Sequence, residues 1–496
     1  MTARLGLLRP SLLTLPMAIL LGAASLPIMS LLSRLQGAGT GLDASSLMQT
    51  VGFALGGAVV STAVGAVAGL LAGTRDLPGR KWLVAASCVL VAAPPAFWWI
   101  GATRVPFVPW GILAGPLDAA IVAGLALSPV TLLLVYAALR EIPSNLYEAA
   151  RVALPPLRRV RFVLLPLLRA PLAGGFLLTV ILLLGESEIP FLFGFRTAMT
   201  DIVTTFSQTF DVARVVPLAL PLLMLVLGLG GLAGGPLLRT VLASSRGAHG
   251  VVRKPAPAIL SLVAGVPGAL ALFSLGGYAL AVVSGLNRGW PSVQLDPVTL
   301  LPSLAEPVIC AWMMVLLVVA AAYPARASGQ MRWFLLAGLL LFCVPAGVFG
   351  IGWISVSQAL GGLTIFPGVA HVSRAVGLPA LGFAIAYSRL PRSLEDAARL
   401  VAVSPPRRAF QIVLPLLSPS LAASSALVAA LTFADRDVAS VLLAPGASRL
   451  MLDLYLVSAN APSATVGAVA LVVLAGASLT VGVAAVGPLL LWRRRV

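Results

Sequence analysis

The chain has 496 residues, of which 59% are hydrophobic and 10% are charged, with 33 Lys and Arg against 16 Asp and Glu. This composition excludes a soluble globular protein and indicates a polytopic membrane protein. The formal net charge of +17 needs no nucleic acid as a partner. Basic residues gather in the cytoplasmic loops of membrane proteins, where they also attract anionic membrane lipid.

Twelve stretches of the chain are long enough to supply the roughly 20 apolar residues that a bilayer core requires. The first six lie near 11–32, 47–73, 83–103, 112–139, 171–193 and 215–240. The second six lie near 257–285, 300–323, 333–358, 365–388, 419–445 and 463–492. We therefore predict an all-α polytopic membrane protein of about twelve transmembrane helices.

A short, polar and basic segment at 247–256 divides these spans into two sets of six. We predict that residues 1–246 form a first half, that 247–256 is a cytosolic linker, and that 257–496 forms a second half. Two halves with an even number of spans lie parallel in the membrane. Most Lys and Arg residues fall on one side if both termini are cytoplasmic, which is the orientation that the positive-inside rule favours.

One loop occurs twice, after the fourth span and again after the tenth. The first copy contains Glu148-Ala149-Ala150-Arg151, and the second contains Asp396-Ala397-Ala398-Arg399. Each copy continues into a proline pair, an arginine pair and a Leu-Pro that opens the next span. Asn145 and Ser393 stand three residues before the acids and look like caps that start a short helix, which the proline pair ends. A repeat at a long fixed period indicates duplicated units.

At these residues the sequence resembles the permease subunits of binding-protein-dependent ABC importers. Their loop has the pattern Glu-Ala-Ala, three residues, Gly, nine residues, Ile, one residue, Leu-Pro. The second copy matches this spacing, with Asp396 for Glu and Ala402 for Gly, whereas the first copy is one residue shorter. The fused double-length form is most similar to the ferric-iron-type and thiamine-type permeases.

The resemblance implies a type I ABC importer permease in the bacterial inner membrane. It implies two ABC ATPase subunits as partners, which bind ATP and Mg²⁺, and an extracytoplasmic substrate-binding protein. It also implies that each repeated loop is a coupling helix that docks on an ATPase subunit. By this resemblance, the residues expected to couple the chain to the ATPase subunits are Glu148, Ala149, Ala150, Arg151, Asp396, Ala397, Ala398 and Arg399.

A second repeat lies 20 and 22 residues after Pro166 and Pro415, where each half has two acids. These are Glu186 and Glu188, and Asp435 and Asp437. We predict them in the outer part of the fifth and eleventh spans, where an ionisable side chain is costly unless it faces a cavity or a partner. The alternative is that they mark helix ends and pair with Arg196, Arg436 or a docking protein.

Our hypothesis is that these four carboxylates line a path for a cation. Hard cations prefer oxygen ligands, so ferric iron is the first candidate, and thiamine or another small cationic solute is the alternative. The chain has no cofactor of its own and no catalytic or metal site is predicted, because it lacks a phosphate-binding loop and its three cysteines lack ligand spacing. We predict a transport subunit, not an enzyme.

A secondary transporter of the major facilitator type is the main rival, because it also has twelve spans in two parallel sixes. The segment 73–81 resembles the signature of that class between its second and third helices. The repeated loops argue against this class, since they fall between spans four and five of each half, where the facilitator pattern has no equivalent.

Overall fold

The computed structural model is almost entirely helical over the residues that it describes. These are 10–34, 43–81, 83–84, 87, 115–142, 144–243, 254–255, 296–327, 329–362, 366–388, 390, 409–443, 447–460 and 463–493. In this part of the chain the only sheet is a two-residue parallel pairing of β1 (Arg75–Asp76) with β2 (Lys254–Pro255).

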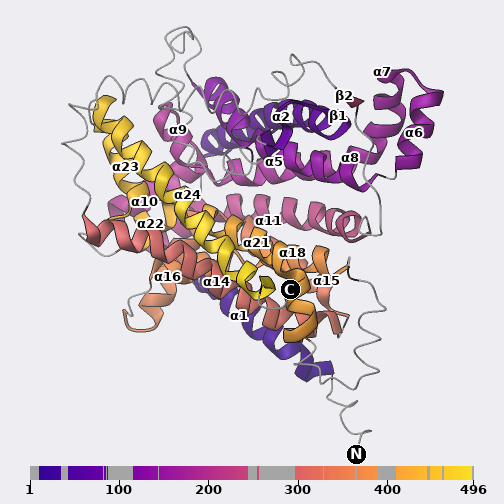
Figure 1. Cartoon of the computed structure of the whole chain (residues 1–496). Coiled ribbons are helices and arrows are strands. Elements are labelled where there is room, and N and C mark those ends of the chain that lie inside the picture. The colour runs from indigo at the N-terminus through magenta and orange to yellow at the C-terminus, as the bar shows by residue number, and fades with distance from the viewer. Residues whose placement is uncertain are drawn as a thin grey trace, which may run out of the picture.

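The helices before β2 are α1 (Pro10–Ser33), α2 (Ala44–Thr74), α5 (Pro116–Glu141), α6 (Ser144–Ala153), α7 (Pro156–Arg159), η2 (Val160–Leu164), α8 (Leu165–Leu184), α9 (Glu188–Leu192), α10 (Ala198–Thr209) and α11 (Val212–Ala243). Those after β2 are α14 (Pro297–Ala327), α15 (Met331–Cys343), α16 (Ala346–Ala359), α17 (Pro367–Arg374), α18 (Gly377–Ser388), η4 (Ala409–Val413), α21 (Leu414–Ala434), α22 (Asp437–Leu442), α23 (Leu450–Asn460) and α24 (Ser463–Arg493). Figure 1 shows their arrangement.

Nine helices in the described ranges are long and apolar enough to cross a membrane. A tenth span is possible if α15 and α16 count as one, although they are bent by 96° at Val344 and Pro345. These ten correspond to ten of the twelve predicted spans, so the all-α polytopic fold class is confirmed. The predicted span near 257–285 lies outside the described residues, as does the span near 83–103 except for 83–84 and 87.

Small residues allow the helices of the first part to pack closely. A Cβ atom on Gly69 of α2 would lie 2.8 Å from the carbonyl oxygen of Leu132 on α5. Such close approach of two backbones is typical of membrane helices, which lack a hydrophobic driving force between them in lipid and associate through tight packing. The glycines of α2 therefore explain why α2 and α5 lie side by side in Figure 1.

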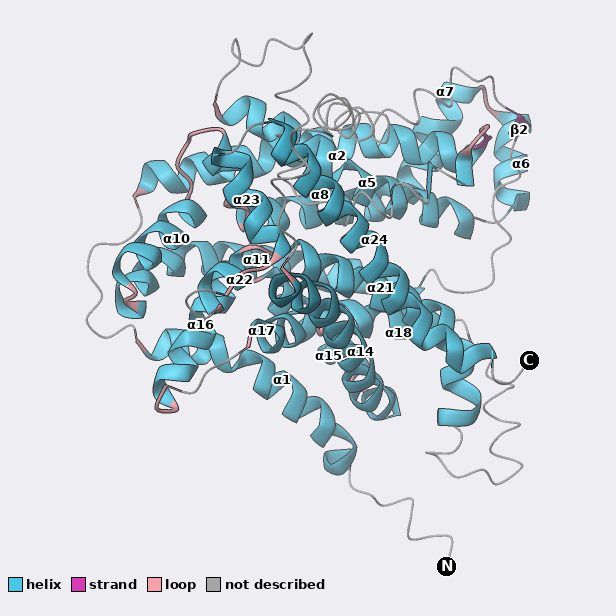
Figure 2. Cartoon of the chain, turned by 60° about the vertical axis from the view of Figure 1, so that its left-hand side comes forward, coloured by secondary structure: helices cyan, strands magenta, loops and turns pink. Residues whose placement is uncertain are grey.

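The core is shared by helices that precede β2 and helices that follow it. One cluster of buried side chains includes Phe53 of α2, Leu183 of α8, Phe334 of α15 and Leu421 of α21. Helix α1 packs against α14 and α16, as Figure 2 also shows. A Cβ atom on Gly352 of α16 would lie 2.6 Å from the carbonyl oxygen of Pro27 in α1. The first helix is thus integrated with the second part of the chain.

Candidate functional site

Helix α6 is the short helix that the first repeated loop predicts. It has ten residues and ends just before Pro155 and Pro156. Its start differs slightly from the prediction, because it begins at Ser144 and Asn145 lies inside it. The Asn145 side-chain oxygen accepts a hydrogen bond from the Leu146 backbone N–H at 2.8 Å, so the predicted capping box with Glu148 is wrong.

One face of α6 holds it against the ends of the spans. Tyr147 and Ala150 are buried, and Tyr147 belongs to a cluster with Leu139 of α5 and Leu164 of η2. The Arg159 guanidinium lies 5.6 Å from the centre of the Tyr147 ring, a distance typical of a cation–π contact. These contacts connect α6 to both neighbouring membrane helices.

The other face of α6 is exposed. Val152 is 91% exposed and Leu146 is 44% exposed, and Glu148 and Ala149 are exposed beside them. Of the four residues predicted to couple in this loop, Glu148 and Ala149 therefore face outward and Arg151 is partly buried. Ala150 packs inward, since it lies three residues after Tyr147 and so on the same face of the helix.

The second copy of the loop, with Asp396, Ala397, Ala398 and Arg399, lies outside the described residues. The structure resumes at η4, which leads into α21 as η2 leads into α8. Both η2 and η4 are five-residue π-helical turns, a wide form that is rare in helices and frequent at functional sites. The two segments thus share an uncommon local structure at the same place in the repeat.

The acids of the second repeat lie beyond the ends of the long helices. Helix α8 ends at Leu184 and α21 at Ala434, so the predicted location of the acids within the spans is wrong. Glu186 Oε1 accepts hydrogen bonds from the backbone N–H groups of Glu188 at 2.8 Å and Ile189 at 3.3 Å. Asp435 Oδ1 accepts one from the N–H of Val438 at 3.1 Å. Each acid therefore satisfies the free amides at the start of a short helix, α9 or α22.

All four acids line one cavity of about 180 Å³, which we call the path cavity. Its other walls are apolar side chains of α5, α8, α15 and α21, which come from both parts of the chain. Arg374 and Arg436 also line it, so the lining has mixed charge rather than the uniformly acidic character that the sequence predicts.

We call residues 185–188, where α8 gives way to α9, the first break, and residues 435–437, where α21 gives way to α22, the second break. Arg436 connects these two breaks. Its Nη2 lies 2.9 Å from Asp437 Oδ1 and donates to Ser187 Oγ at 2.8 Å, while its Nη1 lies 4.0 Å from Glu188 Oε1. The Ser187 hydroxyl in turn donates to Asp437 Oδ1 at 2.9 Å. The predicted alternative of pairing with Arg436 is confirmed, whereas Arg196 pairs with Asp201 at 3.0 Å instead.

Arg374 provides the second positive charge of the path cavity. Its Nη1 lies 3.7 Å from Asp435 Oδ2, and its Nε donates to the carbonyl oxygen of Val344 at 2.9 Å. Its guanidinium lies 5.1 Å from the centre of the Phe342 ring. Sequence reasoning missed Arg374 and Ser187, because nothing in their local pattern distinguishes them from other polar residues of a membrane helix or loop.

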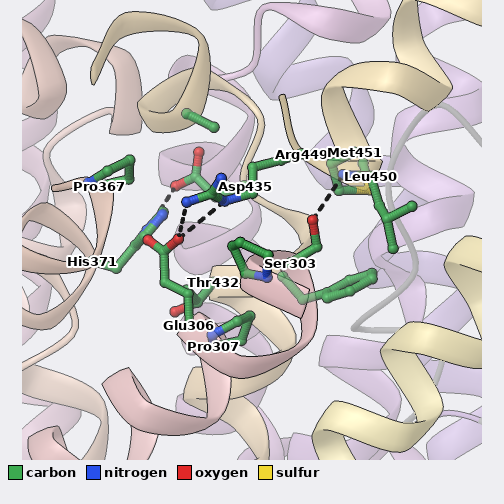
Figure 3. A pocket seen from close by; sticks show the side chains of 13 residues that line it. Ser303, Glu306, Pro307, Pro367, His371, Thr432, Asp435, Arg449, Leu450 and Met451 are labelled. Atoms are coloured by element: carbon green, nitrogen blue, oxygen red, sulfur yellow. Dashed lines mark hydrogen bonds and ion pairs between the residues drawn. The ribbon is translucent and has the colours of Figure 1, made fainter. Parts of the chain in front are cut away.

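Asp435 also lines a smaller neighbouring cavity of about 30 Å³ (Figure 3). His371 Nδ1 lies 3.7 Å from Asp435 Oδ2. Arg449 Nη2 donates to Glu306 Oε2 at 2.8 Å across the same cavity. Asp435 is therefore surrounded by charged and titratable partners on the side away from the path cavity.

Comparison with known proteins gives one match. Residues 65–234 match the family model described as the inner membrane component of a binding-protein-dependent transport system. This supports an ABC importer permease. The matched segment includes α5, α6, α8 and α9, and so contains the exposed face of α6 and both acids of the first break. No curated protein and no solved structure matches the chain significantly.

The arrangement of the side chains around the path cavity is suited to binding a small molecule. Within the parts of the chain that the structure describes, no group of three or more His, Cys, Asp or Glu residues could hold a metal ion. The features that the site offers are a cavity with charged groups at two helix breaks and an exposed helix at the opposite end of α8 (Figure 1).

Proposed function

We propose that this chain is the transmembrane permease of an ATP-driven importer and that it passes a cationic solute, either ferric iron or an organic cation such as thiamine. The observation that carries the proposal is α6, a helix inside the matched segment that is anchored on one face and exposed on the other. An exposed face with Leu146 and Val152 beside Glu148 is suited to a groove on a partner protein.

The partners in this proposal are two ABC ATPase subunits, one for each repeated loop, which bind ATP and Mg²⁺. An extracytoplasmic binding protein delivers the solute. The chain is a double-length fusion of two permease halves in the bacterial inner membrane, with both termini cytoplasmic. The matching order η2, α8, α9 and η4, α21, α22 supports this duplication.

The contacts suggest how α6 transmits movement to the path cavity. Tyr147 and Arg159 join α6 to η2, which continues directly into α8. At its other end α8 leads to Ser187, which contacts Arg436 of the second part. When ATP favours one arrangement of the ATPase subunits, it shifts the arrangement of the helices attached to them. A displacement of α6 would thus be transmitted through η2 and α8 to the contacts between the two breaks.

Exchange of an exposed residue of α6 tests the proposed coupling. Ala149→Arg adds a long charged side chain to the exposed face, and we expect it to reduce the amount of ATPase that copurifies with the chain by about tenfold or more, equivalent to about 1.4 kcal/mol. The matched control is Gln208→Arg, which adds the same side chain to an exposed position of α10 at the far end of the molecule.

ATPase recovered equally with both variants would contradict the role of α6. Uptake in proteoliposomes gives a second measurement, since the proposal requires ATP, the ATPase and the binding protein together. If vesicles that contain this chain alone accumulated solute along an ion gradient, the protein would be a secondary transporter.

A further inference from the structure

We propose that Glu186 is the carboxylate that binds the transported solute in the path cavity, and that this solute is a small organic cation. This inference rests on the proposed function and narrows its substrate class. It follows from how the charges of the path cavity are paired, from the apolar character of the remaining wall, and from the size of the cavity.

Three of the four acids are close to an arginine. Asp437 is 2.9 Å and Glu188 is 4.0 Å from the Arg436 guanidinium. Asp435 is 3.7 Å from the Arg374 guanidinium and 3.7 Å from His371. Two arginines thus offset most of the charge of these three carboxylates, which are held in place by the fold.

Glu186 differs from these three acids. Both of its hydrogen bonds are backbone contacts of Oε1, with the N–H groups of Glu188 and Ile189. Among the described residues, no Lys, Arg or His lies within ion-pair distance of Glu186, although it lines the path cavity. A carboxylate beside an apolar wall is costly unless it is neutralised, and burial raises the pKa of Glu186 to about 8, so either a proton or a cationic solute can neutralise it.

The rest of the wall suits an organic molecule. Leu127 and Val130 of α5, Ile181 of α8 and Leu431 of α21 line the cavity, and each presents an apolar side chain. A cavity needs a volume of roughly 10–15 Å³ to hold one water molecule. The volume of about 180 Å³ is about ten times this minimum or more, so the cavity has room for a small organic molecule.

A trivalent metal ion fits this arrangement poorly. Hard cations require several oxygen ligands around one centre. The other three acids could join Glu186 only if the contacts of Arg374 and Arg436 were broken, which would leave the buried Arg436 and the partly buried Arg374 without these partners. In the described part of the chain, the four carboxylates and two arginines of the lining leave two negative charges without a matching cation, and only Glu186 has no cation within ion-pair distance, so a small organic cation is favoured over ferric iron.

Binding to the full-length chain in lipid nanodiscs tests this assignment. The probes are choline as an organic monocation and Fe³⁺ as the metal ion, measured by titration calorimetry without ATPase. We expect the wild-type chain to bind choline more tightly than Fe³⁺, and Glu186→Gln to weaken choline binding by about tenfold, as expected for the loss of one ion pair. The Gln side chain keeps an oxygen that can still accept from the amides of α9.

Two further variants make the test specific. Asp435→Asn alters the equivalent acid of the second break and should weaken choline binding less than Glu186→Gln does. Asp201→Asn, whose carboxylate pairs with Arg196 outside the cavity, serves as the matched control. Equal losses from the Glu186 and Asp435 variants would overturn the proposal. So would tighter binding of Fe³⁺ than of choline, or no choline binding at millimolar concentration to the wild-type chain, a result that depends on no variant.

The nanodiscs contain the permease chain alone, so this result does not depend on the ATPase. Failure of ATPase copurification would overturn the proposed function and leave the Glu186-dependent binding to be judged separately. Failure of choline binding would overturn the assignment of the solute while ATPase copurification remained.

Discussion

The break between α8 and α9 and the break between α21 and α22 have the same backbone plan but different electrostatics. In both, an acid two residues before a short helix accepts hydrogen bonds from that helix. The second break supplies Arg436 and lies beside Arg374 and His371, whereas the first break supplies no cation. A repeated local structure therefore does not imply repeated chemistry, because Arg436 stands where the first break has Ser187, and Arg374 and His371 come from another helix.

Loss of Arg436 should have the largest effect on this comparison. Arg436→Met removes the cation that lies beside both Asp437 and Glu188, and Arg436 is only 9% exposed. Breaking a buried pair by removing one partner typically costs 3–5 kcal/mol, so we expect the free energy of unfolding to fall by about 3–5 kcal/mol in SDS titrations of mixed micelles.

The control for Arg436→Met is Arg196→Met. Arg196 also pairs with an aspartate at about the same distance, but it is 75% exposed. A surface pair of this kind contributes about 0–1 kcal/mol. If both variants lowered stability by the same amount, the contact between the two breaks would have no special role.

Ser187→Ala should have an intermediate effect. The Ser187 hydroxyl accepts from Arg436 and donates to Asp437, so its removal weakens the contact between the breaks while leaving both charges. Loss of a buried hydrogen-bonding group costs about 1–3 kcal/mol, and the same SDS titration measures it. Ser207→Ala is the matched control, since Ser207 is exposed and bonds only within its own helix. Equal changes in the two variants would contradict the contact.

The smallest effect is expected from the capping acid of the first break. Glu186→Ala removes the acceptor of two amides of α9 and should lower the free energy of unfolding by about 1 kcal/mol, the usual cost of a lost cap. Glu186→Gln should lower it by less, because the amide oxygen can still accept these bonds. A Gln variant as unstable as the Ala variant would mean that the negative charge itself stabilises the break.

Much of this architecture could be predicted from the sequence. Hydropathy predicted the ten spans that the described residues include, because a bilayer requires long apolar helices whatever their packing. The short helix α6 was predicted because Pro155 and Pro156 act locally on the backbone. The spacing after Pro166 and Pro415 singled out four acids that line one cavity in the structure, and their role in a substrate path stays a prediction.

Other features depended on contacts that no local pattern encodes. The inward position of Ala150 depends on how α6 lies against the ends of the spans, and the charge balance of the path cavity depends on Arg374, which is 61 residues from Asp435 in the sequence. The ends of α8 and α21 were misplaced, because apolar residues continue past each helix end and hide the break from a hydropathy pattern.

The sequence by itself determined that this is a helical membrane protein with a short helix before Pro155 and paired acids at two equivalent positions. Helix-forming stretches and proline breaks act over a few residues, so these features need no knowledge of the fold. Only the tertiary structure decided which acids are paired with arginines and which one is left for a solute. Electrostatic pairing acts over a few ångströms of space, and the fold brings together residues that are far apart along the chain.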